Sequence, residues 1–289
     1  MGTKLTSLAV SRHKRSQGAA PLVMLTAYDT PSATMADKAG ADIILVGDSL
    51  AMVVLGHPDT LQVTTQEMAY HTAAVARSNP EALLVADMAW LSYHINTADT
   101  VTNAAQLIRA GAQAVKLEGG AERVPMVDAL VSAQIPVMGH LGLTPQSLLA
   151  QGGYCIQGRS SETALALLAD AKALCHAGCF AIVLEAMPAA VANMITETVD
   201  VPTIGIGAGP GCDGQVLVFH DVLGIETGLR PRFVRRYASL HDQGVEALAQ
   251  FAADVRSGQF PNHTESYEMN PDEQMALEFY DTNHDAEAL

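Results

Sequence analysis

The sequence has little charge and few basic residues, and each shortage excludes a class of protein. Only 16% of its 289 residues are charged, and 16 lysines and arginines stand against 31 aspartates and glutamates, a formal net charge of −15. Nucleic acids and anionic membranes are bound through basic surfaces, so neither is an expected partner. No apolar run approaches the ~20 residues of a membrane span, and none resembling a signal peptide follows the basic N-terminus. We therefore expect a cytoplasmic protein.

Cysteine is also scarce, at four residues in a long chain. Free thiols in a reducing compartment explain so few cysteines better than a disulfide framework does. Cys175 and Cys179 have the i, i+4 spacing of one helix face, but Gly178 interrupts the helix and no second pair of ligands is present. A zinc site is therefore not expected there.

Apolar residues, at 49%, suffice for a large core and exclude a disordered chain. Short apolar runs alternate with amphipathic stretches, which is typical of buried parallel strands joined by helices. The length fits a single (β/α)8 barrel, for which about 250 residues are usual. Eight strands are predicted: Leu22–Tyr28, Asp42–Gly47, Ala82–Ala86, Ala114–Leu117, Ile135–Gly139, Phe180–Leu184, Pro202–Ile206 and Gln215–Phe219.

Polar residues mark where helices between these strands begin. Thr64 or Thr65 is expected to cap a helix that runs through Arg77, and Thr97 to cap one that ends near Gly111.

Glycine marks where helices end. Gly40, Gly111 and Gly178 each precede a strand that closes in an acidic residue. This repeated unit of helix, glycine, strand and acid favours a closed TIM barrel over an open doubly wound sheet.

The C-terminal part departs from the repeat. A helix is expected from about Gly244 to Ser257, and the segment from Glu265 onward contains acids but no lysine or arginine. We predict a single barrel domain over residues 1–261, with an N-terminal extension and a C-terminal helix. Residues 262–289 are predicted to form an acidic tail, either solvated or docked in an oligomer, and their charge favours the solvated tail.

Polar residues end six of the predicted strands. In a TIM barrel the carboxyl ends of all strands share one rim, where active sites assemble. Among these residues, only Asp29 is plausibly explained instead as a helix cap. The six are Asp29, Asp48, Asp87, Glu118, His140 and Glu185.

Carboxylates crowded on one rim repel each other and raise each other's pKa unless a cation lies among them. The predicted ligands are oxygens, without a cluster of cysteine or histidine, which favours Mg²⁺.

Lys116 lies two residues before Glu118 and so points inward on the same strand face. It could form a Schiff base, bind a substrate carboxylate or pair with an acid, and a nearby metal favours carboxylate binding. Glu185, further around the ring, is suited to remove a proton beside a ketone.

The stretch Gly205–Pro210 superficially matches a dinucleotide-binding loop. Its sixth position is proline, and no clear helix begins there with an acid some twenty residues on. A close turn that lets a ligand approach the backbone fits better.

From Ser7 to Pro261 the chain closely resembles the ketopantoate hydroxymethyltransferase family. The matching motifs are Thr26-Ala27-Tyr28-Asp29, Leu45-Val46-Gly47-Asp48-Ser49-Leu50, Ala69-Tyr70-His71-Thr72-Ala73-Ala74-Val75, Val115-Lys116-Leu117-Glu118-Gly119-Gly120, Gly139-His140-Leu141-Gly142-Leu143-Thr144-Pro145-Gln146, Gly152-Gly153-Tyr154 and Ile204-Gly205-Ile206-Gly207-Ala208-Gly209. After Asp87 the family usually continues Leu-Pro-Phe, whereas this chain has Met88-Ala89-Trp90, which leaves the shape of that loop open.

The resemblance implies a single-domain TIM barrel of the phosphoenolpyruvate/pyruvate type. It also implies transfer of a hydroxymethyl group from 5,10-methylenetetrahydrofolate to 3-methyl-2-oxobutanoate, giving ketopantoate on the route to pantothenate. Members of the family form large homo-oligomers, typically decamers, so the resemblance implies the same assembly for this chain.

The resemblance also assigns roles to site residues. Asp48 and Asp87 bind Mg²⁺, and Glu118 joins the metal site either directly or through water. The 2-oxo acid contacts Asp48, Ser49, Asp87 and Lys116. Glu185 matches the proton acceptor, and the role of His140 is open between supporting a neighbour and direct catalysis.

Two alternatives remain to be distinguished. Barrels of the phosphoenolpyruvate mutase and isocitrate lyase kind share a strand-end aspartate and a metal site, but they typically carry a reactive cysteine in a Lys-Lys-Cys-Gly loop, which this sequence lacks. A non-catalytic barrel that senses a 2-oxo acid would need no base, and Glu185 argues against it.

Overall fold

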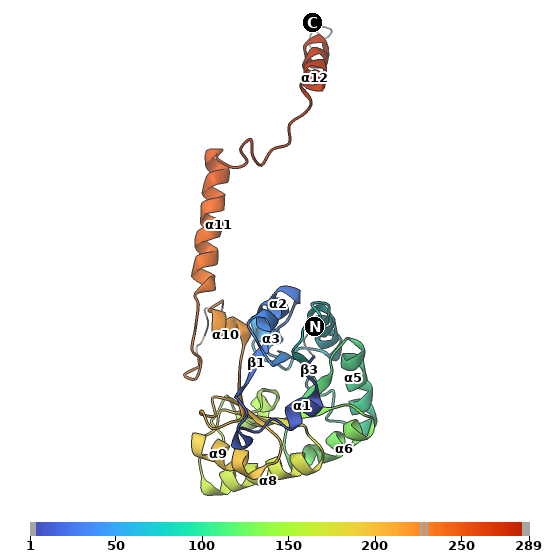
Figure 1. Ribbon diagram of the computed structural model, residues 1–289, viewed down its shortest axis with the longest axis vertical. Coiled ribbons are helices and arrows are strands. Elements are labelled where there is room, and N and C mark those ends of the chain that lie inside the picture. Colours follow the sequence, from blue (N-terminus) through green and yellow to red (C-terminus); the bar gives the residue numbers. More distant parts are fainter. Residues whose placement is uncertain (1–3, 226–227, 229–230, 285–289) are drawn as a thin grey trace. The chain divides into compact units, whose positions relative to one another are not determined.

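The computed structural model describes residues 4–225, 228 and 231–284. Its strands are all parallel and form a closed eight-stranded barrel in sequence order (Figure 1). Their bounds are β1 Leu22–Thr26, β2 Ile43–Val46, β3 Leu83–Asp87, β4 Ala114–Glu118, β5 Val137–Gly142, β6 Ala181–Glu185, β7 Thr203–Ile206 and β8 Gly214–Leu217. The predicted fold class is confirmed, and every predicted strand overlaps an observed one.

Helices connect the strands and lie outside the barrel (Figure 1). The chain divides into two compact units, residues 1–238 and 239–289, and the barrel lies in the first. The α-helices of the first unit are α1 Ser7–Ser11, α2 Thr30–Lys38, α3 Leu50–Val53, α4 Thr65–Ala76, α5 Thr97–Arg109, α6 Val124–Ser132, α7 Leu148–Gln151, α8 Ser161–His176, α9 Ala189–Thr198 and α10 Phe219–Leu223. Short 3₁₀ helices are η1 Arg15–Gln17, η2 Ala121–Arg123 and η3 Pro145–Ser147.

From β2 to β7 both faces of the strands are buried, which explains why these strands are apolar without alternation, whereas β1 and β8 expose Val23 and Gln215. In β2, Ile43 and Leu45 join the cluster inside the barrel, whereas Ile44 and Val46 join the cluster between the strands and the helices. This is the period of two expected for a strand, with an apolar layer on each side. The polar residues at the strand ends are therefore the exceptions to a continuous apolar core.

Most predicted helix ends are confirmed. Thr64 caps α4, and its side chain and that of Glu67 form a reciprocal capping box. The cap predicted at Thr97 was wrong, because the Asn96 side chain accepts the hydrogen bond from the Asp99 amide, which moves the cap one residue earlier. Threonine and asparagine both cap helices, so the sequence alone did not decide between neighbours.

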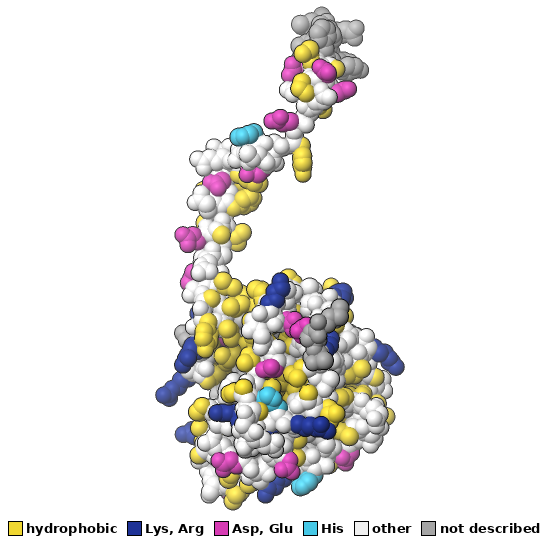
Figure 2. Space-filling model, viewed as in Figure 1, with side chains coloured by type: hydrophobic (Ala, Val, Ile, Leu, Met, Phe, Trp, Pro, Cys, Tyr) yellow, Lys and Arg dark blue, Asp and Glu magenta, His cyan; other side chains and the backbone are white. Residues whose placement is uncertain are grey.

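The second unit, residues 239–289, contains the helices α11 Leu240–Ser257 and α12 Pro271–His284. The first begins four residues before the predicted start at Gly244, and the second lies within the segment predicted as an acidic tail. Hydrophobic side chains are exposed along α11 (Figure 2), with Leu248 70% and Phe251 52% exposed. Among the described residues, no helix combines the length and apolar character needed to cross a membrane.

Candidate active site

A cavity of about 950 Å³ opens at the carboxyl ends of the barrel strands. All seven residues predicted for the site line it: Asp48, Ser49, Asp87, Lys116, Glu118, His140 and Glu185. Strand register places them side by side, because Asp87 pairs with Lys116 between β3 and β4, and Glu118 pairs with His140 between β4 and β5. These seven residues therefore lie together at one rim of the barrel.

Asp48 and Asp87 lie at the ends of β2 and β3 and are almost fully buried. The backbone amide of Asp48 donates to Asp87 Oδ2 over 3.0 Å. This hydrogen bond holds the Asp87 carboxylate close to the end of β2. Burial raises the pKa of Asp48 well above its usual value, and the charges of Asp87 and Glu118 raise it further. Burial likewise raises the pKa of Asp87. A cation would relieve this repulsion.

Lys116 is buried and its Nζ lies 3.0 Å from Asp87 Oδ1. Burial opposes its charge, but the neighbouring carboxylates Asp87, Glu118 and Asp48 outweigh burial and raise the pKa of Lys116 above its usual value. The neighbouring carboxylates therefore favour the charged ammonium form of this side chain. A protonated amine is a poor nucleophile, which disfavours the Schiff base left open by the sequence.

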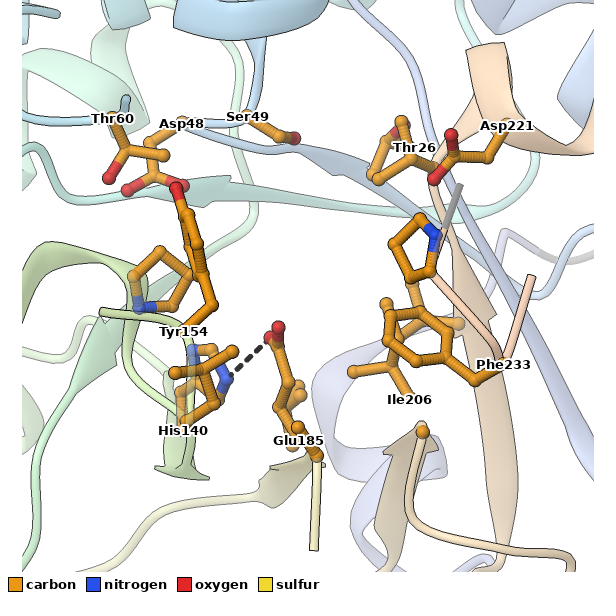
Figure 3. Close-up of a pocket in the computed structure, with 18 of the residues that line it drawn as sticks. Thr26, Asp48, Ser49, Thr60, His140, Tyr154, Glu185, Ile206, Asp221 and Phe233 are labelled. Carbon is orange, nitrogen blue, oxygen red and sulfur yellow. Dashed lines mark ion pairs between the residues drawn. The ribbon is translucent and has the colours of Figure 1, made fainter. Parts of the chain in front are cut away.

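His140 lies between two glutamates. Its Nδ1 is 3.3 Å from Glu118 Oε1, and its Nε2 is 3.1 Å from Glu185 Oε2, the ion pair drawn in Figure 3. Burial and Lys116 lower the pKa of His140, but the two glutamates raise it more, to about 9. Burial raises the pKa of Glu118, yet the hydrogen bond and charge of His140 bring it below its usual value. The histidine thus links a predicted metal-site residue to the predicted base.

The ends of β5 and β6 fix the position of Glu185. Gly142 pairs with Glu185 in register, and the amide of Leu143 donates to the Glu185 carbonyl over 2.9 Å. Gly142 has φ +99°, and a Cβ there would collide with the Glu185 carbonyl. Ala186, directly after the glutamate, has φ +47°, a strained conformation for a residue with a Cβ. The carboxylate points into the cavity (Figure 3).

The opposite wall of the cavity is mostly apolar. Ile206 and Phe233 face Glu185 across the cavity (Figure 3), and Val218 also lines it. The glycine-rich stretch forms a turn between β7 and β8 with no intervening helix, and Gly207 and Gly209 have positive φ. A Cβ at Gly207 would lie 2.7 Å from the Phe233 ring. The predicted close turn is confirmed, and a dinucleotide-binding helix is absent from this described segment.

Three further residues of the site were not predicted from the sequence. Tyr28 is buried and its hydroxyl lies 2.9 Å from Ser49 Oγ. Gln146 Nε2 donates to Asp48 Oδ2 over 2.8 Å, and the Tyr93 hydroxyl donates to Gln146 Oε1 over 2.6 Å. Tyr28 and Gln146 fall within family motifs, which was the available signal, whereas Tyr93 follows the segment that departs from the family.

Asp29, in contrast, does not belong to the site. Its carboxylate caps α2 by accepting from the Ser32 amide over 2.8 Å. The helix-cap explanation offered for this acid from the sequence is confirmed. All four cysteines lie among the described residues and are free, and Cys179 is buried.

The residues present fit a divalent cation held by two carboxylates. Within the described ranges, no group of three or more His, Cys, Asp or Glu side chains is arranged to hold a metal. Mg²⁺ needs few protein ligands, because it usually keeps several waters and binds substrate oxygens. Asp87 Oδ1 is buried and lies 3.0 Å from Lys116 Nζ, but this contact is not a well-aligned hydrogen bond. Glu118 Oε2 accepts from Gln146 N, and Glu118 Oε1 lies 3.3 Å from His140 Nδ1, so this residue fits a role through water.

Solved structures with the same fold share little sequence with the chain. A phosphonopyruvate hydrolase solved in complex with oxalate and Mg²⁺ aligns with a TM-score of 0.59 at 14% identity, covering 98% of this chain and 99% of that one. A 2,3-dimethylmalate lyase, described as a member of the phosphoenolpyruvate mutase/isocitrate lyase superfamily, aligns with a TM-score of 0.53 at 17% identity, covering 98% of each chain. At these identities the likeness is one of fold.

Sequence relatives are much closer. The 3-methyl-2-oxobutanoate hydroxymethyltransferase of Moorella thermoacetica is 56% identical over 85% of this chain and 92% of its own length. The enzyme of that name from Ignicoccus hospitalis is 56% identical over 86% of this chain and 94% of its own length. The profile of the family described as ketopantoate hydroxymethyltransferase matches residues 5–263. The chain therefore belongs to the ketopantoate hydroxymethyltransferase family.

Proposed function

We propose that the protein transfers a hydroxymethyl group from 5,10-methylenetetrahydrofolate to 3-methyl-2-oxobutanoate, giving ketopantoate and tetrahydrofolate for pantothenate biosynthesis. The observation that carries the proposal is the arrangement of charges in one cavity. Asp48, Asp87 and Lys116 form a buried cluster on one side, and Glu185 points into the same space. Such a cavity suits a small 2-oxo acid that must lose a proton. The family and the names of its relatives support the same reaction.

The polar side of the cavity would bind the 2-oxo acid. Lys116 would hold the substrate carboxylate, and Ser49, oriented by the Tyr28 hydroxyl, would donate a hydrogen bond to it. Asp48 and Asp87 would hold Mg²⁺, with Glu118 supporting it through water. A bound Mg²⁺ would supply a Lewis acid that favours negative charge on the 2-oxo oxygen. The oxalate and Mg²⁺ named for the phosphonopyruvate hydrolase support a site of this kind on this fold.

Glu185 would act as the base. It would take the proton from C3 of the 2-oxo acid, with His140 holding its carboxylate in place over 3.1 Å. The C3 electron pair would then form a bond to the methylene carbon, the two bonds from that carbon to N5 and N10 of tetrahydrofolate would break, and these nitrogens would receive the C3 proton and one proton of water. Water would supply the hydroxyl oxygen of the product. His140 in this proposal positions the base and does not itself take the C3 proton.

The apolar wall would receive the one-carbon donor. A cavity of about 950 Å³ lies at the upper end of the range for small-molecule sites and exceeds what a five-carbon acid fills. A flat pterin ring could pack against Ile206 and Phe233, opposite Glu185 (Figure 3). The methylene carbon would then lie between the wall and the enolised carbon.

We also propose a cytoplasmic homo-oligomer, a decamer as the family resemblance implies. The exposed apolar side chains of α11 support association with further copies of the chain. Val245, Leu248, Phe251 and Val255 are three or four residues apart, so they share one helix face, and each is about half exposed or more.

A turnover assay with the purified protein tests the proposed reaction directly. The protein, Mg²⁺, 3-methyl-2-oxobutanoate and 5,10-methylenetetrahydrofolate should yield ketopantoate and tetrahydrofolate in equal amounts, measured by mass spectrometry. Omission of either organic substrate is the control. Binding of the 2-oxo acid without turnover would favour the non-catalytic barrel instead.

A further inference from the structure

Gln146 is a buried polar residue that the proposed reaction does not use. It lies in η3, just after β5, and only 6% of its surface is exposed. Its backbone amide donates to Glu118 Oε2 over 3.0 Å. Its side-chain Nε2 donates to Asp48 Oδ2 over 2.8 Å and to the Met88 carbonyl over 2.9 Å. One residue therefore contacts two of the three acids of the predicted metal site, Asp48 and Glu118.

The hydrogen bonds of Gln146 define the orientation of its amide. Both Nε2 hydrogens have acceptors, and Oε1 accepts from the Tyr93 hydroxyl over 2.6 Å. The same hydroxyl accepts from the Glu118 amide over 3.1 Å. A flipped amide would place Oε1 against Asp48 Oδ2 and the Met88 carbonyl, three acceptors without a donor. The neighbouring groups thus allow one orientation.

This orientation determines which carboxylate oxygens remain for a ligand. Gln146 donates to Asp48 Oδ2, which turns Oδ1 into the less engaged oxygen of Asp48 for a cation or substrate. For Glu118, Oε2 accepts from Gln146 and Oε1 faces His140. Because the loop after β3 supplies Tyr93 and Met88, and the loop after β5 supplies Gln146, the network also ties these two loops together.

We infer that Gln146, oriented by Tyr93, is a positioning residue that fixes the carboxylates of Asp48 and Glu118 for binding a divalent cation. This role rests on the proposed function, which places the cation at Asp48 and Asp87. It also explains why the substituted segment Met88–Trp90 is compatible with the site. Gln146 contacts the backbone of Met88, so the side chain there can vary without loss of the hydrogen bond.

The test is the affinity of the full-length protein for Mn²⁺ alone, measured by electron paramagnetic resonance of the free ion. Gln146→Met keeps the approximate shape but removes both side-chain donors and the side-chain acceptor. The backbone amide that contacts Glu118 remains, so the variant tests the contact with Asp48. Groups that orient metal ligands typically contribute 10–100-fold to metal affinity, so the Kd for Mn²⁺ should rise by that factor. Gln151→Met is the matched control, because the Gln151 side chain in α7 donates to Thr144 and contacts none of the acids.

The outcomes separate the inference from the proposed function. Absence of Mn²⁺ binding by the wild type would contradict the proposed metal site itself. If the wild type binds Mn²⁺ and folded Gln146→Met binds it with a Kd within twofold of the wild-type value, the positioning role is overturned and the proposed metal site is not. A purely structural role would lower the Tm of Gln146→Met and leave its Mn²⁺ Kd unchanged.

Tyr93→Phe provides a second test that does not depend on the folding of the glutamine variant. It keeps the buried ring and removes only the hydroxyl, which orients the Gln146 amide and also accepts from the Glu118 backbone amide, so the Kd for Mn²⁺ should rise, by less than in Gln146→Met. In the double variant the two effects should be less than additive, because Tyr93 acts through Gln146. Fully additive effects, or an unchanged Kd in Tyr93→Phe, would overturn the claim that Tyr93 orients this amide.

Discussion

Two aspartates of the site are held in an arrangement that is unfavourable without a ligand. Burial raises the pKa of both Asp48 and Asp87, the charge of Asp87 raises that of Asp48 further, and the charge of Glu118 raises both. If a cation bound there also binds the substrate, removal of either carboxylate should weaken both. We predict that Asp48→Ala and Asp87→Ala each raise the Kd for Mn²⁺ and for 3-methyl-2-oxobutanoate by about 30-fold or more, the equivalent of roughly 2 kcal/mol or more for a buried charged partner.

Isothermal titration of each ligand measures both values. Asp29→Ala is the control, because Asp29 also follows a barrel strand but caps α2. It should cost about 1 kcal/mol of stability and leave both ligand affinities unchanged. Full turnover by wild-type protein after exhaustive chelation would contradict the metal requirement.

Lys116 separates substrate binding from metal binding. Its ammonium group is assigned to the substrate carboxylate, and a hydrogen bond to a charged group contributes about 1.5–3 kcal/mol. Lys116→Ala should therefore raise the Kd for the 2-oxo acid by about 10–100-fold and change the Kd for Mn²⁺ much less. Equal weakening of both ligands in the same titrations would place Lys116 with the metal-binding groups instead.

The residues that carry charge could be predicted from the sequence, whereas their supporting partners could not. Asp48, Asp87 and Glu185 each close an apolar strand, a pattern visible in one dimension. Gln146 and Tyr93 contact the acids through loops that are far apart along the chain. Nothing in a local pattern specifies that a glutamine after β5 reaches an aspartate after β2.

At the scale of elements, the paired ends of β5 and β6 determine where the base lies. Gly142→Ala should disturb this pairing, because a Cβ at φ +99° would run into the Glu185 carbonyl. We predict a loss of about 1–3 kcal/mol in the free energy of unfolding and a lower kcat, with little change in Mn²⁺ affinity. Urea unfolding and steady-state kinetics measure these effects.

Gly18→Ala isolates the effect of backbone strain. Gly18 has φ +88°, but no atom lies within 4 Å of an added Cβ. This variant should lose stability and keep its kcat. A Gly142→Ala enzyme with wild-type kcat would show that the β5 end does not position Glu185.

Element boundaries were predictable where apolar runs and glycines mark them. All eight strands and the turns at Gly40, Gly111 and Gly178 follow from such marks, and these glycines have positive φ. The start of α11 and the presence of α12 were not predicted from the sequence. The side chains of α11 and of residues 271–278 are mostly exposed, so the sequence carries no strong core pattern there.

At the scale of the whole molecule, the exposed apolar face of α11 predicts how copies of the chain associate. Leu248→Asp combined with Phe251→Asp places two charges on that face. If the face is buried between copies, the assembly should dissociate to a smaller species, measured by light scattering after size-exclusion chromatography. Leu165→Asp, on the exposed surface of α8, is the control and should leave the mass unchanged. An unchanged mass for the α11 variant would exclude this face from the interface.

The central claim is that Glu185 removes the C3 proton of the 2-oxo acid, and solvent exchange tests it without the folate substrate. In D₂O with Mg²⁺, the wild-type enzyme should exchange the C3 proton of 3-methyl-2-oxobutanoate for deuterium, followed by NMR. Glu185→Gln should still bind the 2-oxo acid but exchange ~10²–10⁴-fold more slowly, the usual contribution of a positioned base. Glu197→Gln, at an exposed position of α9, should exchange at the wild-type rate. Wild-type exchange by a Glu185→Gln variant with intact binding would contradict the account.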